Sequence, residues 1–592
     1  MNKQFRYNSY EFKLPIEYNP IFFRNKMPDP WTFLKKMTRE EVVRLVLVLG
    51  NVYEGTPFSH VLYLMSDGNW WKKYVELRIF DYIGRHTTSN KRYFVCFPQT
   101  ILEILRYKFS MPPSSSSMYK QEKNSFEFDL VKLIALINEQ TMGYRLKNKN
   151  SMEELMVTGI GYNKEIQLYD YDNQFKYQLS FAITFFSFLT SQEEYQDLYY
   201  GFLSYYGISD WREYVCTILS LAIMGRDKNG ILDLASFRDP DHLINVDIVE
   251  KISIPLSTNP IPYKSRDEYD RDGNSDYKVF RDKPIIKMSS HKYAIYHVGF
   301  VLDRLYSSLF FDFKKIVEKL NGKQSVVFNL FTSEFIEKHV FCSLMNQCAI
   351  SSSYLKYSEN DCENQYKAPK SELGAPDYLV QRKDGTSAII FECKDIKINA
   401  WVKEQRDYAL LEDELKNKIQ LTTWELDYEN RCHRFKKKPK VKGVGQLAGH
   451  CTCIKSGKFK WGNSIQQNAK IYSVLVIADN RLLIDGLAPI VSEWYVESLR
   501  NENSPIDANV RPLIIMSPLC LLKHSERFAK EGFEKYFEGY YKRIENTQGN
   551  RFDIISRNTS FDSYMDKYPY KISDKFELLK NELLKGRKAT NE

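Results

Sequence analysis

Apolar and polar positions repeat with a helical period through the first half of the chain. In "MTREEVVRLVLVLGNVY" the apolar residues recur every three or four positions, and Thr38 with Glu41 fits a capping box at the start of a helix. A polar stretch rich in Pro and Ser at 111–124 predicts a loop, and the highly charged segment 263–278 predicts a linker. We therefore predict a mainly helical region that ends near residue 280.

Beyond that linker, strand and helix periods are mixed. "KPIIKMSSHKYAIYHV" alternates apolar and polar residues around 289–291, which predicts a hairpin. The further predictions are helices at 299–320, 401–421 and 443–455, a helix in "SEFIEKHVFCSLM" with Phe331, Phe335, Val340, Phe341 and Leu344 on its apolar face, a hairpin at 378–394, and strands at 470–478 and 510–516. This order predicts an α/β (α+β) domain, a mixed sheet with helices packed against it.

After Ser517 the spacing in "LKHSERFAKEGFEKYFEGYYKRI" and in "ISDKFELLKNELLKG" is again helical, which predicts a C-terminal helical cap. Its aromatic and basic side chains could stack on single-stranded nucleic acid, although an ordinary amphipathic helix is the commoner explanation.

Composition narrows the class of protein. With 592 residues, 43% of them hydrophobic, the chain is long enough for two to four folded domains. The ten cysteines are scattered and form no CxxC pair, as is typical of reduced thiols in a cytoplasm. No apolar run reaches the roughly 18 residues that span a bilayer, and no signal peptide is evident. We expect a soluble, cytoplasmic protein without membrane contact.

The net charge of +9 is weak evidence for an anionic partner, but its distribution is informative. No Asp or Glu occurs between Arg431 and Lys460, so this stretch could hold a phosphate backbone, or it could be a solvated loop. The candidate nucleic-acid-binding residues are Arg431, Arg434, Lys436, Lys437, Lys438, Lys440 and Lys442. A zinc site is the alternative for Cys432, His433, His450, Cys451 and Cys453, although their spacing matches no standard site.

The segment "SELGAPDYLVQRKDGTSAIIFECKD" carries the most specific signal. Asp384-Gly385 is a strong hairpin signal, which we interpret as a two-residue loop in which Gly adopts positive φ. With that loop, Asp377 lies directly opposite Glu392 on the neighbouring strand. Opposed like charges destabilise a sheet unless something compensates, and a divalent cation such as Mg²⁺ or Mn²⁺ would do so.

Alternation along the strand puts Glu392 and Lys394 on one face, and Phe391 and Cys393 on the other. A Glu and a Lys at the end of a buried strand are costly unless they are paired or functional. Phosphodiester hydrolysis needs a cation that polarises the phosphate and a positive group beside the attacking water. The alternative is a structural ion triad, in which Lys394 neutralises Asp377 and Glu392 without metal.

These residues resemble the PD-(D/E)xK, or restriction-endonuclease-like, nucleases over about residues 325–520. The motif stands here as Pro376-Asp377 and Glu392-Cys393-Lys394. The resemblance implies a restriction-endonuclease-like fold in which Asp377, Glu392 and the Cys393 carbonyl hold the metal and Lys394 lies beside the nucleophile.

A helix before the hairpin supplies a further acidic residue in this family, which Glu337 matches best, with Glu334 as the runner-up. A later helix often carries a glutamine, which matches Gln446. The chain departs from some relatives at His450, where they carry Tyr four residues after the glutamine.

We therefore expect a Mg²⁺- or Mn²⁺-dependent nuclease that cuts DNA, in the bacterial anti-phage defence setting that the resemblance implies, either as a homo-oligomer or with a partner protein. The alternatives are an RNase on the same fold and a nucleic-acid-binding or scaffold subunit without catalysis. The expected domains are a sensor or recognition region at 1–280, a hairpin and connecting helix at 281–324, the nuclease at 325–520 and the cap at 521–592.

Overall fold

The computed structural model covers the chain in well-placed stretches separated by segments that are left undescribed. It describes residues 12–15, 28–52, 91–94, 98–113, 129, 132–139, 171–225, 230–236, 244–261, 277–351, 353–366, 373–399, 402, 408–427, 432–463, 465–479, 482–483, 486–502, 507–545 and 560–569. The predicted linker at 263–278 and the final helix near 572–586 lie almost entirely or entirely outside these residues.

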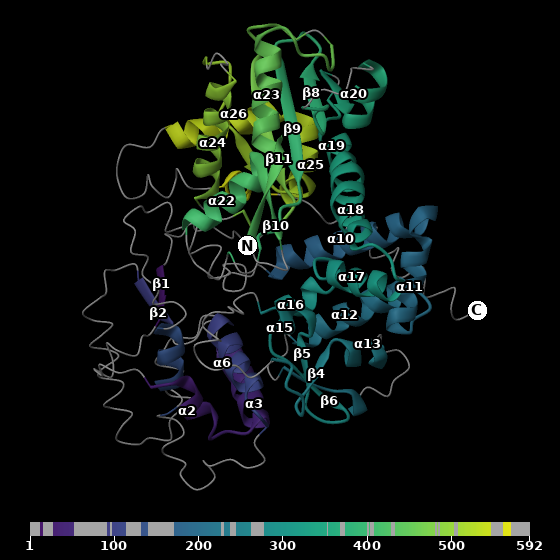
Figure 1. Cartoon of the computed structure of the whole chain (residues 1–592), viewed down its shortest axis with the longest axis vertical. Coiled ribbons are helices and arrows are strands. Elements are labelled where there is room, and N and C mark those ends of the chain that lie inside the picture. Colours follow the sequence, from purple (N-terminus) through teal and green to yellow (C-terminus); the bar gives the residue numbers. More distant parts are fainter. Residues whose placement is uncertain are drawn as a thin grey trace. The chain divides into compact units, whose positions relative to one another are not determined.

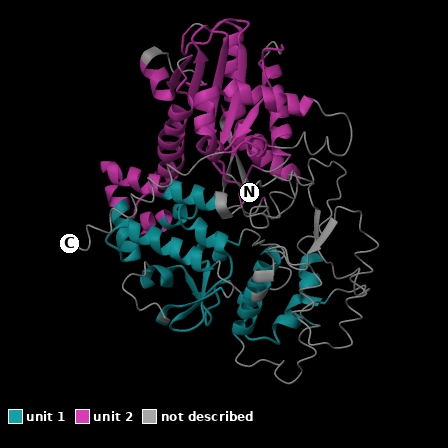
Figure 2. Ribbon diagram, turned by 180° about the vertical axis from the view of Figure 1, so that it is seen from behind, with its two compact units in different colours: residues 1–147, 165–182, 199–312 teal, residues 148–164, 183–198, 313–592 magenta. Residues whose placement is uncertain are grey.

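The chain forms two compact units (Figure 2). Unit 1 comprises Met1–Lys147, Glu165–Ala182 and Tyr199–Asp312, and unit 2 comprises Asn148–Lys164, Ile183–Leu198 and Phe313–Glu592. The units therefore divide the chain elsewhere than near residue 280. Residues 281–312 group with the first half, and two short stretches of that half, 148–164 and 183–198, group with the predicted nuclease region.

Unit 1 combines helices with a small mixed sheet. Its helices are α2 (Pro30–Leu34), α3 (Arg39–Val52), α6 (Pro98–Ser110), α12 (Trp211–Gly225), α13 (Val246–Lys251), α15 (Lys278–Asp282) and α16 (Val298–Asp303), with the first part of α10 (Tyr171–Ser191) and most of α11 (Gln196–Tyr206). Its strands are β1 (Phe12–Pro15), β2 (Lys91–Phe94), β3 (Ile231–Asp233), β4 (Ser253–Pro255), β5 (Ile285–Lys287) and β6 (Lys292–Ile295), and the last four form a sheet in the order β3-β6-β5-β4. Apolar side chains from α2, α3 and α6 share one core with Ile286 and Ala294 of this sheet.

Two local predictions in unit 1 are confirmed and one is wrong. Thr38 and Glu41 form the capping box, with Thr38 N donating to Glu41 Oε2 over 2.7 Å and Glu41 N donating to Thr38 Oγ1 over 3.2 Å. β5 and β6 pair antiparallel as the predicted hairpin. The single helix predicted at 299–320 is instead α16 and α17 (Leu309–Lys319). The chain turns between them because the carbonyl of the buried Arg304 accepts a hydrogen bond from Tyr214 Oη instead of from a backbone N–H of a continuing helix.

The centre of unit 2 is a five-stranded mixed sheet among the described residues (Figure 1). Its order is β13-β12-β9-β8-β7, in which β7, β8 and β9 are antiparallel while β12 runs parallel to both β9 and β13. The strands are β7 (Tyr354–Ser358), β8 (Tyr378–Arg382), β9 (Ser387–Lys394), β12 (Lys470–Ile477) and β13 (Ile514–Met516). The 378–394 hairpin and the strand near 470–478 are confirmed, the strand predicted at 510–516 is shorter, and β7 was not predicted.

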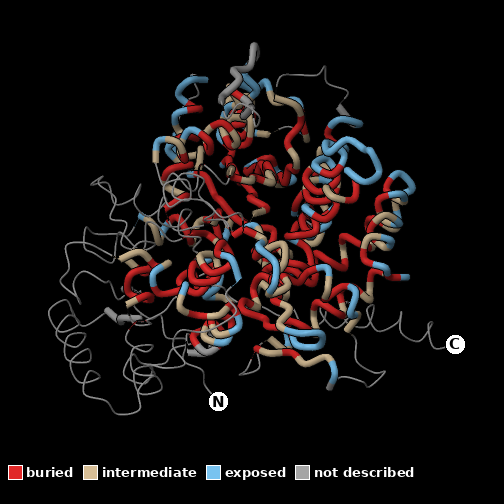
Figure 3. The backbone as a smooth tube through the Cα atoms, turned by 60° about the horizontal axis from the view of Figure 1, so that its bottom comes forward, coloured by how far each residue is buried: buried red, intermediate tan, exposed pale blue. Residues whose placement is uncertain are grey.

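Helices cover both faces of this sheet. α23 (Gly443–Lys455) packs against β9 and β12, and the Tyr495 hydroxyl of α24 (Leu487–Asn501) lies 2.8 Å from Ser473 Oγ of β12. On the opposite face, Phe391 of β9 contacts Phe341 and Phe533. Buried residues run along the backbone in stretches broken by exposed helix turns (Figure 3). No helix in the described part of the chain is both long and apolar enough to cross a membrane.

The remaining helices of unit 2 complete these layers. They are α18 (Gln324–Asn329), η4 (Leu330–Phe341), α19 (Cys342–Cys348), α20 (Glu359–Tyr366), α22 (Tyr408–Ile419), α25 (Pro518–Glu531), α26 (Phe533–Glu545) and α28 (Phe561–Met565), with the later part of α17. The helix at 443–455 has its predicted bounds, whereas α22 ends two residues before the prediction.

The helix η4 is a π-helix, not the α-helix that was predicted. Its buried apolar residues come in pairs five positions apart: Leu330 and Phe331, Phe335 and Ile336, Val340 and Phe341. In a π-helix, residues five apart are linked by backbone hydrogen bonds, so successive pairs lie closer to one face than they would in an α-helix. The predicted apolar side chains are buried, but the helix that carries them is wider than expected.

The basic stretch is a strand rather than a loop. β11 (Cys432–Val441) pairs antiparallel with β10 (Leu421–Asp427), and a register shift lies between Thr422 and Trp424. Arg431 lies outside the described residues, as do the side chains of Arg434, Lys436, Lys437 and Lys438. Lys440 is exposed and Lys442 is half-buried.

Candidate functional site

The hairpin of β8 and β9 has the predicted register. Tyr378 pairs with Phe391 and Gln381 pairs with Ala388, which is the alignment that places Asp377 across from Glu392. The turn differs in detail, because β8 ends at Arg382 and β9 begins at Ser387, which leaves a four-residue loop. Within that loop Gly385 has a φ of 73°, as predicted, and its N–H donates to the Arg382 carbonyl over 2.9 Å.

Asp377 lies one residue before the paired part of the hairpin. Its Oδ2 accepts a hydrogen bond from the Cys393 amide over 2.6 Å and lies 3.0 Å from Lys394 Nζ. Its own carbonyl accepts from the Glu359 amide over 3.2 Å. The N–H and carbonyl of one residue point to the same edge of an extended strand, so the Cys393 carbonyl faces the Asp377 side.

Glu392 and Lys394 form the inner part of the site. Lys394 Nζ lies 2.9 Å from Glu392 Oε2 as well as 3.0 Å from Asp377 Oδ2, so one ammonium bridges two carboxylates. The Glu392 side chain is 0% exposed, and neither of its oxygens has a hydrogen-bond partner of good geometry among the described residues. A buried carboxylate that lacks such partners is costly, so stability alone does not account for Glu392.

Burial and mutual repulsion dominate the electrostatics of these groups. Burial and the nearby charge of Asp377 raise the pKa of Glu392 well above its usual range. Burial by itself would lower the pKa of Lys394, but the charges of Asp377, Glu392 and Glu337 outweigh it and raise that pKa. The site therefore favours a fixed positive charge next to the carboxylates.

Two further glutamates reach the same strand end. Burial and the charges of Asp377 and Glu359 raise the pKa of Glu337 on η4 to about 7, against the opposing effect of Lys394. Burial and Asp377 also raise the pKa of Glu359, the first residue of α20. Glu337 thus lies at the site as predicted, whereas the runner-up Glu334 is paired with Lys338 at 2.9 Å. Glu359 was missed, because no motif or spacing distinguishes it.

Gln446 forms hydrogen bonds with two backbone groups near the site. Its Oε1 accepts from the Gly443 amide over 3.0 Å, and its Nε2 donates to the Leu373 carbonyl over 3.3 Å. It therefore ties the start of α23 to the segment that leads into Asp377. A Cβ at Gly449 would lie 2.6 Å from the Leu373 side chain, so this position needs glycine for the same close approach.

His450 is the residue of α23 that faces Glu392. Its side chain is 1% exposed in the chain as described, and its Nε2 lies 3.8 Å from Glu392 Oε1. Burial lowers the pKa of His450 to about 4, so the imidazole is neutral at pH 7. In the sequence, His450 is a candidate only for the alternative zinc site and a departure from the family pattern. Its position facing Glu392 could not be predicted from the spacing of residues.

The donor chemistry of the site fits Mg²⁺ or Mn²⁺. Three carboxylates, Glu337, Asp377 and Glu392, surround one ammonium, and oxygen ligands of this kind suit hard divalent cations. The unsatisfied oxygens of Glu392 are the structural observation that supports such an ion. Within the described residues, however, no three Asp, Glu, His or Cys side chains already converge on one point. In this arrangement Lys394 Nζ lies between two of the three carboxylates.

Few of the other candidate residues are placed at this site by the described part of the structure. Lys442 is close enough to lower the pKa of Glu337, whereas the side chains of five other predicted binding residues are undescribed. The alternative zinc cluster gains no support from the described residues, since His450 faces Glu392 and no metal-binding group is found there. In the C-terminal helices, Tyr536, Tyr540 and Tyr564 are buried in the core, so these rings are not placed for stacking on bases.

Comparison of the chain with protein-family models, with curated proteins and with solved structures finds no match.

Proposed function

We propose that unit 2 is a Mg²⁺- or Mn²⁺-dependent nuclease of restriction-endonuclease-like fold that hydrolyses phosphodiester bonds in DNA. The observation that carries the proposal is the strand end where Asp377, Glu392 and Lys394 meet in the register predicted from the sequence. The mixed sheet, with helices on both faces, supports the same proposal. The bacterial defence setting rests on the resemblance alone.

Each side chain has a distinct part in this proposal. Asp377, Glu392 and Glu337, with the Cys393 carbonyl, would hold the cation, which when bound polarises the phosphate and lowers the pKa of water. Lys394 would donate hydrogen bonds to the attacking water or to a phosphate oxygen and balance the charge that develops there. Gln446 is a positioning residue, which fixes the segment before Asp377 through Leu373.

The direct test is cleavage of plasmid DNA by the full chain with Mn²⁺ or Mg²⁺. We expect Asp377→Asn and Lys394→Ala each to reduce the rate by about a hundredfold or more, as is usual when one charged group is removed from a transition state. Lys383→Ala is the matched control, because Lys383 is exposed at the other end of the same hairpin. Wild-type protein that cuts neither DNA nor RNA, or active-site variants that cut as well as Lys383→Ala, would refute the proposal.

The rival function is a scaffold that keeps the fold without catalysis, and one observation favours it. Lys394 already neutralises two of the carboxylates, so the cluster is able to exist as an ion triad without metal. Calorimetric titration separates the two: Mn²⁺ binding that Glu392→Gln abolishes supports the enzyme, and absence of divalent-cation binding supports the scaffold. Cleavage of RNA but not of DNA in the first assay would identify the RNase alternative.

A further inference from the structure

A gap between two buried polar atoms lies on the α23 side of Glu392. His450 Nε2 and Glu392 Oε1 are 3.8 Å apart, which is too long for a hydrogen bond. Neither atom has a hydrogen-bond partner among the described residues, and both side chains are almost fully buried. Two such atoms facing each other unsatisfied are costly, which points to a third group between them in the working protein.

The chemistry of the two atoms restricts what that group is. When Glu392 is ionised, as a metal ligand must be, its oxygens only accept, and a neutral imidazole protonated at Nδ1 also presents a lone pair at Nε2. A water or a cation satisfies both lone pairs together, and the cation is favoured because Glu392 is already one of the ligands proposed for it. Mg²⁺ prefers oxygen ligands and keeps its waters, whereas imidazole nitrogen suits transition metals.

The packing of α23 fixes the orientation of the His450 ring toward Glu392. Gln446 and Gly449 attach the helix to the segment around Leu373, through the hydrogen bond and the close contact described above. The ring of Phe459 meets the His450 ring edge-on, with centroids 6.0 Å apart. The first two contacts come from the helix before position 450 and the third from the segment after the helix, and a preorganised nitrogen of this kind loses little entropy on binding a metal.

We infer that His450 is a nitrogen ligand of the divalent cation at Glu392 and biases the site toward Mn²⁺ over Mg²⁺. This inference rests on the proposed function, since it concerns the same cation. It goes beyond that function by identifying a ligand outside the three-residue motif and by stating which cation the site selects.

The test is pulsed electron paramagnetic resonance of Mn²⁺ bound to the full chain at pH 8, where an ordinary imidazole is neutral. We expect a ¹⁴N coupling in the wild type that changes to a ¹⁵N coupling when the histidines are ¹⁵N-labelled, and that His450→Phe abolishes. His524→Phe is the matched control, because His524 is equally buried but lies on α25. Calorimetry should show Mn²⁺ affinity falling roughly 10- to 100-fold in His450→Phe, with Mg²⁺ affinity changing much less.

Other outcomes overturn the inference and separate it from the proposed function. Mn²⁺ that binds through Glu392 without histidine nitrogen coupling, or a coupling that survives in His450→Phe, overturns the role of His450 and leaves the nuclease proposal standing. Failure of any divalent cation to bind overturns both. If His450→Phe does not fold, the labelling result in wild-type protein and the His450→Gln variant decide the question.

Discussion

At the scale of single residues, two buried glutamates of unit 2 differ in how their carboxylates are used. Glu414 is 1% exposed, accepts a hydrogen bond from Asn399 Nδ2 over 2.7 Å and lies 2.6 Å from Lys418 Nζ. Glu392 is 0% exposed, and among the described residues its close partner is Lys394, which Asp377 shares, with His450 Nε2 farther away at 3.8 Å. One Glu414 oxygen, Oε1, therefore has several donors while Oε2 has none, whereas neither oxygen of Glu392 has a hydrogen-bond partner among the described residues.

This difference predicts opposite effects of the same substitution in metal-free protein. Glu414→Gln should lower the free energy of unfolding by about 1–3 kcal/mol, because it weakens a charged, hydrogen-bonded contact. Glu392→Gln should not lower it and should raise it by about 1 kcal/mol, since a neutral amide is cheaper to bury. Urea unfolding followed by circular dichroism measures both. A loss in Glu392→Gln as large as that in Glu414→Gln would show that Glu392 is a structural residue.

The sequence was sufficient for the residues that a strand register can place. Asp377, Glu392 and Lys394 follow from the turn and from alternation, because a hairpin fixes which positions are opposed. Glu359 and His450 could not be predicted in the same way. Each reaches the site through the packing of a separate helix, and no local period encodes that packing.

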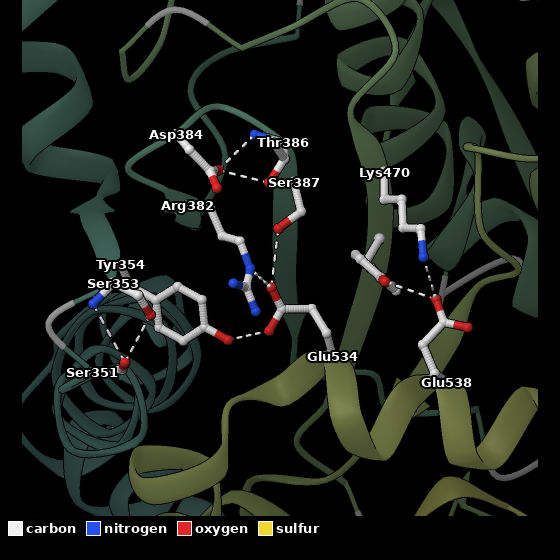
Figure 4. Close-up of polar contacts among 11 residues, drawn as sticks. Ser351, Ser353, Tyr354, Arg382, Asp384, Thr386, Ser387, Lys470, Glu534 and Glu538 are labelled. Atoms are coloured by element: carbon white, nitrogen blue, oxygen red, sulfur yellow. Dashed lines mark hydrogen bonds and ion pairs between the residues drawn. The ribbon is translucent and has the colours of Figure 1, made fainter.

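At the scale of elements, a polar cluster fastens helix α26 to the sheet at the end of β8 and the start of β9 (Figure 4). Glu534 of α26 accepts hydrogen bonds from the Tyr354 hydroxyl, from Arg382 Nε over 2.9 Å and from Ser387 Oγ over 3.0 Å. Burial would raise the pKa of Glu534, but these hydrogen bonds and the charge of Arg382 outweigh it and lower the pKa. The ionised carboxylate is therefore the form that the fold stabilises.

Removing this carboxylate should destabilise unit 2. We expect Glu534→Ala to lower the free energy of unfolding by about 3 kcal/mol at pH 7, because it leaves the Arg382 contact broken and three donors without their acceptor. Since the pKa in the folded state is depressed, this contribution is present above the unfolded-state pKa of Glu and is lost as pH falls toward the folded-state value.

Chemical denaturation at pH 7 and at lower pH tests this prediction, and the difference between wild type and Glu534→Ala should shrink on acidification. Glu531→Ala is the control, because Glu531 lies just before α26 in a surface pair with Lys535, and its loss should change stability far less than the loss of Glu534. Equal losses in the two variants, or a difference that is independent of pH, would contradict the assigned role.

Elements were predictable where one local period dominates. The β8–β9 hairpin, α23 and the capping box at Thr38 are of this kind. The segment "LFTSEFIEKHVF" was predicted as a helix but not as the π-helix η4, because its apolar pattern does not distinguish i→i+5 from i→i+4 hydrogen bonds. The strand β11 was not predicted, because its run of Lys indicates a solvated loop or a phosphate-binding surface, and its pairing with β10 overrides that preference.

At the scale of the whole molecule, the two compact units are each assembled from discontinuous stretches of chain. Composition predicted more than one domain, and the mixed character of the fold followed from the order of helix and strand periods. The division itself was not predictable, because the boundary falls within α10, α11 and α17 and not in a polar linker.

The pH dependence of stability is also a property of the whole molecule, and two buried groups near the C-terminus should act on it in opposite directions. Burial, with the charges of Lys523 and Arg527, lowers the pKa of His524 to about 4. The unfolded chain, with an ordinary histidine pKa, takes up this proton first, so stability falls as pH drops from about 6.5 to 4.

Burial raises the pKa of Asp562 to about 6 despite hydrogen bonds from Ser517. Its folded form keeps the proton longer, so stability falls as pH rises from about 4 to 6.

The two effects oppose each other in wild-type protein between about pH 4 and 6, and single variants should reveal each one. The shift of His524 is worth about 3 kcal/mol over its range, and that of Asp562 somewhat less, because its side chain keeps part of its surface exposed. His524→Phe should therefore be most stable at the acidic end of this window relative to wild type, and Asp562→Asn at the upper end. Urea unfolding at half-unit steps of pH measures the slopes. Parallel curves for wild type and both variants would show that neither group titrates abnormally in the folded state.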